Sequence, residues 1–188
     1  GESFQKRWRR PVLSVSCGDE ALLFQPRDSS RTHADIRLLV TNCGRESARN
    51  VQCTLQVIRE WEDGKWNRRL SFLPLRLYWQ IERDICLPVL APESSCLLDL
   101  GVLSDPTLVS GGGPREIYLH TMSSGTRLTM ERTEVEIIIT SDDHLHYHGF
   151  FEIDLKPERF IPIKESFTIK ETRRITFDQA PWWKHWCS

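Results

Sequence analysis

Three histidines at alternating positions are the residues whose types and spacing most directly suggest chemistry in this chain. They lie in the run DDHLHYHG as His144, His146 and His148. Residues two apart on a β-strand share one face, so the three imidazoles would line up as a candidate metal site. Their Cα atoms would lie about 7 Å apart, so neighbouring pairs can chelate an ion but all three converge poorly. The pattern favours exposed histidines at a strand end instead, and we expect no cofactor.

Other residue patterns that carry catalysis are missing from the chain. The sequence holds no GxSxG motif for a serine nucleophile and no cysteine in the context of a reactive thiol. The run SDPTLVSGGGP lacks the Lys-Ser/Thr of a phosphate-binding loop, which favours a surface loop. The carboxylates of Glu134 and Glu136, and those of Asp142 and Asp143, are expected to be solvated rather than to form an acid–base pair. We therefore expect no enzyme, with a metal-dependent enzyme or metal-binding protein centred on the histidines as an alternative.

Seven tryptophans give the chain a second candidate surface. A tryptophan ring offers a large flat face, so exposed rings can serve as a platform for sugars, and a carbohydrate-binding module is another alternative. The same rings can equally fill a core, which is the interpretation we favour for Trp79. The other tryptophans considered for a platform are Trp61, Trp66, Trp182, Trp183 and Trp186.

The first ten residues, GESFQKRWRR, combine basic and aromatic side chains and carry a charge of +3, four cations against Glu2. Tryptophan favours the interface between lipid and water, and Lys and Arg mark the cytoplasmic side of a membrane. We expect an anionic membrane or a partner to be contacted through this leader, residues 1–10, with help from the C-terminal tryptophans. The side chains of this predicted surface are Lys6, Arg7, Trp8, Arg9, Arg10, Trp182, Trp183 and Trp186.

Composition places the chain among soluble globular domains. Its 188 residues are 27% charged and 39% hydrophobic, and the net charge of −1 gives no reason to expect a nucleic-acid partner. None of the six cysteines forms a CxxC pair, so zinc-ribbon and thioredoxin readings have no support. Cys53 and Cys96 fall in apolar strand patterns, where free thiols pack as small hydrophobes. We expect reduced cysteines and a cytosolic setting.

Alternating apolar residues predict the elements that position these groups. Ile36, Leu38 and Val40 alternate with other residues, and so do Val51, Cys53, Leu55 and Val57, which indicates two strands joined by the turn Asn42-Cys43-Gly44. We expect Gly44 to take a positive φ there. Asp63-Gly64 predicts a hairpin whose flanking tryptophans pack across the strand pair. About eight such strands predict an all-β antiparallel sandwich over residues 11–157, followed by a tail or extra hairpin over residues 158–188.

The stretch from residue 34 to residue 58 resembles bacterial Ig-like domains of the cell-adhesion-related type. Those domains carry a Val-x-Asn-x-Gly turn, a small residue and Asn-Val at the start of the next strand. The matching residues here are Val40, Asn42, Gly44, Ala48, Asn50 and Val51. The resemblance implies an Ig-like antiparallel β-sandwich. The early segment, in which a basic stretch precedes Pro11 and a short strand, is also similar to bacterial proteins that hang such a domain behind membrane helices.

These observations together predict a non-enzymatic interaction or accessory module. The resemblance implies a cytoplasmic domain of a bacterial protein tethered to the inner face of the membrane. We expect a protein partner, an anionic membrane surface near the leader, and no nucleic acid.

Overall fold

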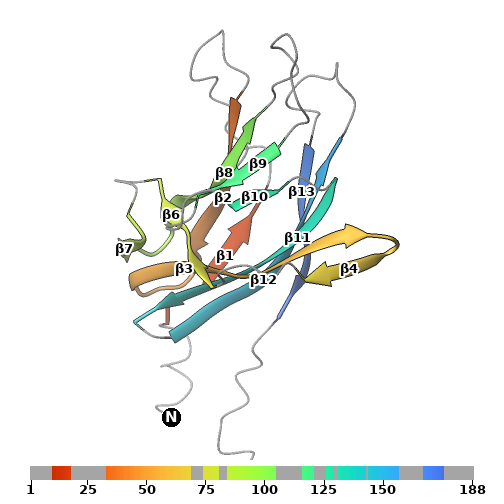
Figure 1. The fold of residues 1–188 in the computed structure, drawn as a ribbon. Coiled ribbons are helices and arrows are strands. Elements are labelled where there is room, and N and C mark those ends of the chain that lie inside the picture. Colours follow the sequence, from red (N-terminus) through yellow and green to blue (C-terminus); the bar gives the residue numbers. More distant parts are fainter. Residues whose placement is uncertain are drawn as a thin grey trace, which may run out of the picture.

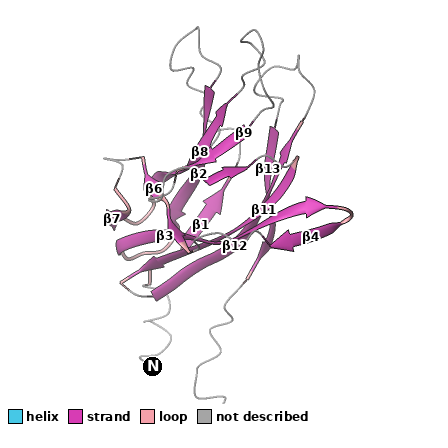
Figure 2. Cartoon of the chain, in the orientation of Figure 1, coloured by secondary structure: helices cyan, strands magenta, loops and turns pink. Residues whose placement is uncertain are grey.

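The structure is a computed structural model of the whole chain. It describes residues 10–17, 33–68, 74–80, 84–104, 116–120, 126–128, 131–142, 144–156 and 167–175. Every regular element in these ranges is a β-strand, as Figure 2 shows. Across the same ranges, no helix is long and apolar enough to cross a bilayer.

The strands form two antiparallel sheets, which confirms the predicted β-sandwich architecture (Figure 1). The described ranges hold thirteen strands instead of about eight, and three of these strands, β5, β6 and β10, are only two or three residues long. A strand that short shows no alternation that a sequence pattern can detect. The strands are β1 (Leu13–Ser16), β2 (His33–Asn42), β3 (Ala48–Glu62), β4 (Lys65–Arg68), β5 (Leu75–Arg76), β6 (Tyr78–Trp79), β7 (Cys86–Leu90), β8 (Ser95–Ser104), β9 (Glu116–Leu119), β10 (Thr126–Leu128), β11 (Arg132–Ser141), β12 (His144–Leu155) and β13 (Phe167–Arg174).

The two strands predicted from the central alternation belong to different sheets. The first sheet has the order β1-β2-β8-β9-β10, with β6 also paired to β8. The second sheet has the order β13-β12-β11-β3-β4, with β5 and β7 also paired to β3. The loop of residues 43–47 therefore carries the chain from one sheet to the other, and the apolar faces of β2 and β3 meet in one core. β13 lies in the stretch where the sequence predicts a tail or extra hairpin, and it pairs with β12 at the edge of the second sheet.

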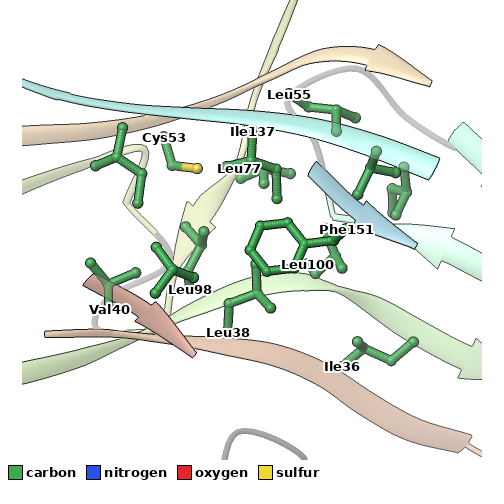
Figure 3. Packing of buried hydrophobic residues seen from close by; sticks show 14 of the residues in the cluster. Ile36, Leu38, Val40, Cys53, Leu55, Leu77, Leu98, Leu100, Ile137 and Phe151 are labelled. Atoms are coloured by element: carbon green, nitrogen blue, oxygen red, sulfur yellow. The ribbon is translucent and has the colours of Figure 1, made fainter. Parts of the chain in front are cut away.

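The core between the sheets is built from the alternating apolar side chains of both (Figure 3). Leu38 of β2, Leu98 of β8 and Ile137 of β11 are fully buried. Among the described residues Trp79 is the largest fully buried side chain, and its indole Nε1–H donates to the backbone oxygen of Val51 at 3.0 Å. The tryptophan that the sequence assigns to the core is confirmed in that position.

Asn42 holds in place the loop of residues 43–47, which we call the crossing loop. Its side chain is fully buried, and its Oδ1 accepts from the backbone N–H groups of Val12 at 3.2 Å and Gly44 at 3.0 Å. Its Nδ2 donates to the backbone oxygens of Glu46 at 2.8 Å and Leu90 at 3.0 Å. One amide therefore satisfies four backbone groups from β7, the crossing loop and the segment before β1, which meets the requirement that buried polar groups be paired.

The conformation predicted for Gly44 is wrong. Its φ is not positive, and the left-handed residue that follows the crossing loop is Asn50, with a φ of 51°. Gly44 is required because backbone passes over it: an added Cβ would lie 2.5 Å from the backbone nitrogen of Val12 and 2.8 Å from the Cα of Pro11. Sequence alternation cannot reveal this contact, because it joins residues more than 30 positions apart.

We expect Gly44→Ala to lower the free energy of unfolding by about 1–3 kcal/mol, the usual cost of overpacking a closely packed site. The new methyl group meets backbone atoms, which cannot turn aside as a flexible side chain would. Urea denaturation measures the change. Gly64→Ala is the comparison, since Gly64 has a φ of 78° and open space around its Cα, so only conformational strain of about 1–2 kcal/mol is expected there. An unchanged midpoint for Gly44→Ala would contradict the close backbone contact.

The predicted hairpin at Asp63-Gly64 is confirmed. Both residues have positive φ, 52° and 78°, as a type I′ turn requires. Trp61 and Trp66 are register partners on β3 and β4, and their rings pack edge to face with centroids 5.1 Å apart. In Figure 1 this hairpin extends beyond the body of the sandwich.

Cys53 and Cys96 are buried, as predicted. Burial raises the pKa of the Cys53 thiol, so this thiol stays neutral at physiological pH. The five cysteines within the described ranges are free thiols, and Cys187 lies outside those ranges. The cytosolic setting remains a prediction.

Candidate functional site

A groove of about 960 Å³ opens at the end of the sandwich where the first described residues enter the fold. Three segments line it: residues 10–12, the crossing loop of residues 43–47, and the turn and strand start at residues 141–146 apart from Asp143, which lies outside the described residues. Two apolar side chains in it are exposed, Val12 at 55% and Leu145 at 40%. The groove therefore combines apolar side chains with charged groups of both signs.

Backbone and side-chain hydrogen bonds fix residues 10–12, which we call the entry segment, against the sandwich. The N–H of Val12 donates to Asn42, and its carbonyl oxygen accepts from the N–H of Cys43 at 2.8 Å. His146 reaches the same segment, since its ring donates to the backbone of Pro11, whose only hydrogen-bonding group is a carbonyl. The position of the entry segment is thus set by its contacts with the folded domain.

His146 joins the entry segment to β11. Its Nε2 lies 2.5 Å from the hydroxyl oxygen of Ser141. Burial is the main cause that lowers the pKa of His146, and it outweighs hydrogen bonds to the backbone of Pro11 and Ser141 that favour the charged form. The lowered pKa favours the neutral imidazole at neutral pH.

The three predicted histidine ligands take three different positions. His144 is the exposed first residue of β12. His146 is the extra residue of a β-bulge, because Leu145 pairs with Thr140 and Tyr147 with Ile139. The Nε2 of His148 lies 2.7 Å from the carboxylate of Glu136. The bulge interrupts the alternation on which the predicted alignment depends, and no group of three or more His, Cys, Asp or Glu side chains in the described part is arranged to hold a metal ion.

Zinc and chelators are expected to leave the melting temperature of the protein unchanged. The metal site remains a prediction, and its test is a thermal melt of the wild type and of a His146→Ala, His148→Ala double variant, each with EDTA or zinc. The double variant should lose about 1 kcal/mol for each hydrogen bond removed, equally in both conditions. A zinc-dependent rise in melting temperature that the double variant abolishes would favour the metal site instead, since a ligand at 100 times its Kd adds about 2.7 kcal/mol.

The outer face of the second sheet carries a network of ion pairs that the sequence analysis missed. Glu134 and Glu136 were expected to be solvated, but their side chains are only 16% and 14% exposed and both pair with Arg59. Phe150 lies opposite Glu136 on the same face and is 2% exposed. The guanidinium of Arg173 covers its ring at 3.8 Å from the centroid, and the His148 ring stacks on it at 5.4 Å. The carboxylates of Glu134 and Glu136 are engaged in ion pairs with Arg59, so they do not form a free acid–base pair.

A second cluster of the same kind lies next to the projecting hairpin. The guanidinium of Arg132 lies over the rings of Trp61 and Trp66, 4.9 Å and 5.2 Å from their centroids. The same guanidinium donates two hydrogen bonds to Glu152, at 2.8 Å and 3.1 Å, and its hydrogen bonding is the main reason that the pKa of Glu152 is lowered. Trp61 remains 37% exposed. Both tryptophans were candidates from the sequence, but their contact with Arg132 could not be predicted, because it depends on strand register.

Most of the predicted membrane or partner surface lies outside the described residues. Arg10 is the exception: it is exposed and lines the groove. The other members are Lys6, Arg7, Trp8, Arg9, Trp182, Trp183 and Trp186.

The groove is lined by apolar, charged and hydrogen-bonding side chains. Ser141 is 3% exposed and engaged with His146, so it is poorly placed as a nucleophile. Exposed Val12 and Leu145 beside Arg10 and Asp142 suit a ligand surface that is partly apolar and partly charged. No family model matches the chain, and neither a curated protein nor a solved structure matches it.

Proposed function

We propose that this chain is a non-enzymatic interaction module that works at an anionic membrane surface on the cytoplasmic side. The observation that supports the proposal is the fixed entry segment. The basic and aromatic leader ends at Arg10, and residues 10–12 are held against the sandwich beside a groove with exposed apolar side chains. A module tied in this way would present one end to the membrane and leave its other surfaces to a protein partner.

The charge of the leader gives this membrane contact its expected strength. Each Lys or Arg near an anionic leaflet contributes about 1 kcal/mol, so the four basic residues of the leader would hold the chain only weakly: Lys6, Arg7, Arg9 and Arg10. Trp8 adds an aromatic side chain of the kind that favours the membrane interface. Weak binding of this kind fits a supporting role beside another anchor better than a stand-alone membrane protein.

Vesicle co-sedimentation tests the proposal. We expect the full chain to bind vesicles of phosphatidylglycerol and phosphatidylcholine at low salt, and the binding to weaken as salt screens the charges. Removal of residues 1–9 should weaken the binding by at least about tenfold, while circular dichroism and the melting temperature stay unchanged. The proposal fails if the full chain does not bind at low salt, or if the shortened chain binds equally well.

We also propose that the sandwich is of the Ig-like kind, as the resemblance over residues 34–58 implies. Ig domains place strands A, B and E in one sheet and C, F and G in the other. The neighbouring strands β1-β2-β8 would correspond to A-B-E, and the neighbouring strands β3-β11-β12 to C-F-G. The strand β13 would then be an addition beyond strand G, and β9 and β10 would take the place next to strand E. This correspondence of strand order supports an Ig-like fold and carries no argument about the function.

A carbohydrate-binding module is the second candidate, and the projecting hairpin supports it. Trp61 is among the few large apolar side chains of the described part that remain exposed, and Arg132 beside it could donate to sugar hydroxyls. A glycan array with the wild type and a Trp61→Ala variant tests this candidate. Binding of a glycan that Trp61→Ala abolishes would support it, and a wild type that binds no glycan would remove it.

A further inference from the structure

We propose that the groove end of the folded sandwich is itself a lipid-docking surface, so that the domain and the leader contact the same anionic bilayer together. This inference rests on the proposed membrane function and adds to it the part of the folded domain that would touch the lipid. It also specifies that the groove end of the domain would face the bilayer.

Exposed apolar side chains gather at this end. Six large hydrophobic residues in the described part are exposed: Val12, Trp61, Val89, Tyr118, Leu145 and Ile175. Val12 and Leu145 line the groove. The N–H of Ile175 donates to the carbonyl of His148, three positions beyond Leu145, which places Ile175 about 10 Å further along β12. Such a gathering of exposed apolar groups on a soluble domain marks a contact surface.

Val89 belongs to the same end. It pairs with Arg49 at the start of β3, and the carbonyl of Arg49 accepts from the N–H of Asp142, which lines the groove. Four of the six exposed hydrophobic residues therefore lie at or near the groove, while Trp61 is on the projecting hairpin and Tyr118 is on β9. Figure 1 shows β9 toward the opposite end of the sandwich from the start of β12.

The described chain also begins at the groove and ends close to it. Arg10 lines the groove, and Ile175 follows the end of β13 beside β12. Residues 1–9 and 176–188 therefore connect to the sandwich at this end, and these two stretches carry Trp8 and the three C-terminal tryptophans. By sequence, the stretches that attach here contain tryptophans, which favour the membrane interface, and this is why we assign a lipid surface as the occupant.

The charges of the groove indicate how the groove and the leader would each contribute to lipid binding. Arg10 and Arg45 are balanced by Glu46 and Asp142 among the groove residues, so the groove supplies no net attraction to an anionic lipid. Insertion of Val12 and Leu145 would contribute through apolar burial, which salt does not screen, and the leader would contribute through charge, which salt does screen. The entry segment, to which the leader is attached in sequence, is held at the groove because the backbone of Val12 is bonded to Asn42 and Cys43.

The experiment uses the full chain and vesicles of phosphatidylglycerol and phosphatidylcholine. We expect the double variant Val12→Asn, Leu145→Asn to bind about tenfold more weakly than the wild type, with the salt dependence of the remaining binding unchanged. Only side chains change, so the backbone bonds of Val12 are kept, and the melting temperature checks the fold. Tyr118→Asn is the matched control, since Tyr118 is 37% exposed and lies away from the groove.

The outcomes separate this inference from the proposed function. Binding of the double variant at wild-type strength, while removal of residues 1–9 abolishes binding, would overturn the docking surface and leave the membrane function standing. An equal loss in Tyr118→Asn would also overturn it, because the effect would not be specific to the groove. A full chain that binds no vesicles at low salt would overturn the proposed function and the docking surface together.

Discussion

Asn42→Ala is expected to lower the free energy of unfolding by about 4 kcal/mol, among the largest effects of any single substitution at a polar residue in this fold. The substitution removes four hydrogen bonds and leaves two backbone N–H groups and two carbonyls without their buried partner. An unsatisfied buried group costs about 1–3 kcal/mol, and partial access of water to the crossing loop reduces the sum. Urea denaturation followed by circular dichroism measures the change.

Two further variants show whether the hydrogen bonds of Asn42 are the cause. Asn42→Asp keeps the acceptor oxygen but loses both donations to Glu46 and Leu90, so we expect it to destabilise the fold as well. Asn67→Ala is the control, because Asn67 lies on the exposed hairpin and a change there should stay within about 0.5 kcal/mol. A cost for Asn42→Ala no larger than that of Asn67→Ala would show that the amide does not hold the loop.

Trp79→Ala is the second large expected effect, at about 3–5 kcal/mol, the range for emptying the site of a buried aromatic side chain. Trp79 is the largest fully buried side chain in the part of the chain that the structure describes, and it lies on β6, a strand of two residues. So short a strand has little backbone pairing of its own, and the indole supplies much of what attaches it to the core. The loss is measured as a shift of the urea midpoint.

Trp79→Phe separates packing from hydrogen bonding at this site. Phenylalanine keeps most of the ring but removes the Nε1–H that donates to Val51, so we expect a smaller cost of about 1–3 kcal/mol. Trp66→Phe is the control on the hairpin, where no core is disturbed, and should be nearly neutral. Equal stability of Trp79→Ala and wild type would contradict the burial.

Local alternation was enough to predict the sandwich, and the reason can be seen in individual strands. Leu38 and Val40 on β2, and Val51 and Cys53 on β3, all point into the core as their spacing predicts. Alternation does not state which strands are neighbours, so the pairing of β3 with β11 and of β2 with β8 could not be predicted from it. Very short strands such as β5 also leave no periodic signal.

The candidate site was predictable only in part because register shifts move side chains. The bulge at His146 adds one residue to β12 and places this histidine against Pro11 and Ser141 instead of beside the other two histidines. Phe150 could not be identified as a buried residue on the outer face, since its cover comes from Arg173 on another strand. The groove itself depends on the entry segment, whose contacts with Gly44 join parts of the chain far apart in sequence.

The pairing of β3 has a consequence for how the protein opens in solution. Along one edge β3 pairs with β11, and along the other it pairs in turn with β7, β5 and β4. Amide hydrogens in its centre can therefore exchange with solvent only when a large part of the second sheet opens, whereas the hairpin of β3 and β4 can fray alone. Hydrogen exchange should show β3 divided between slowly exchanging amides near Cys53 and Leu55 and rapidly exchanging ones near Glu62.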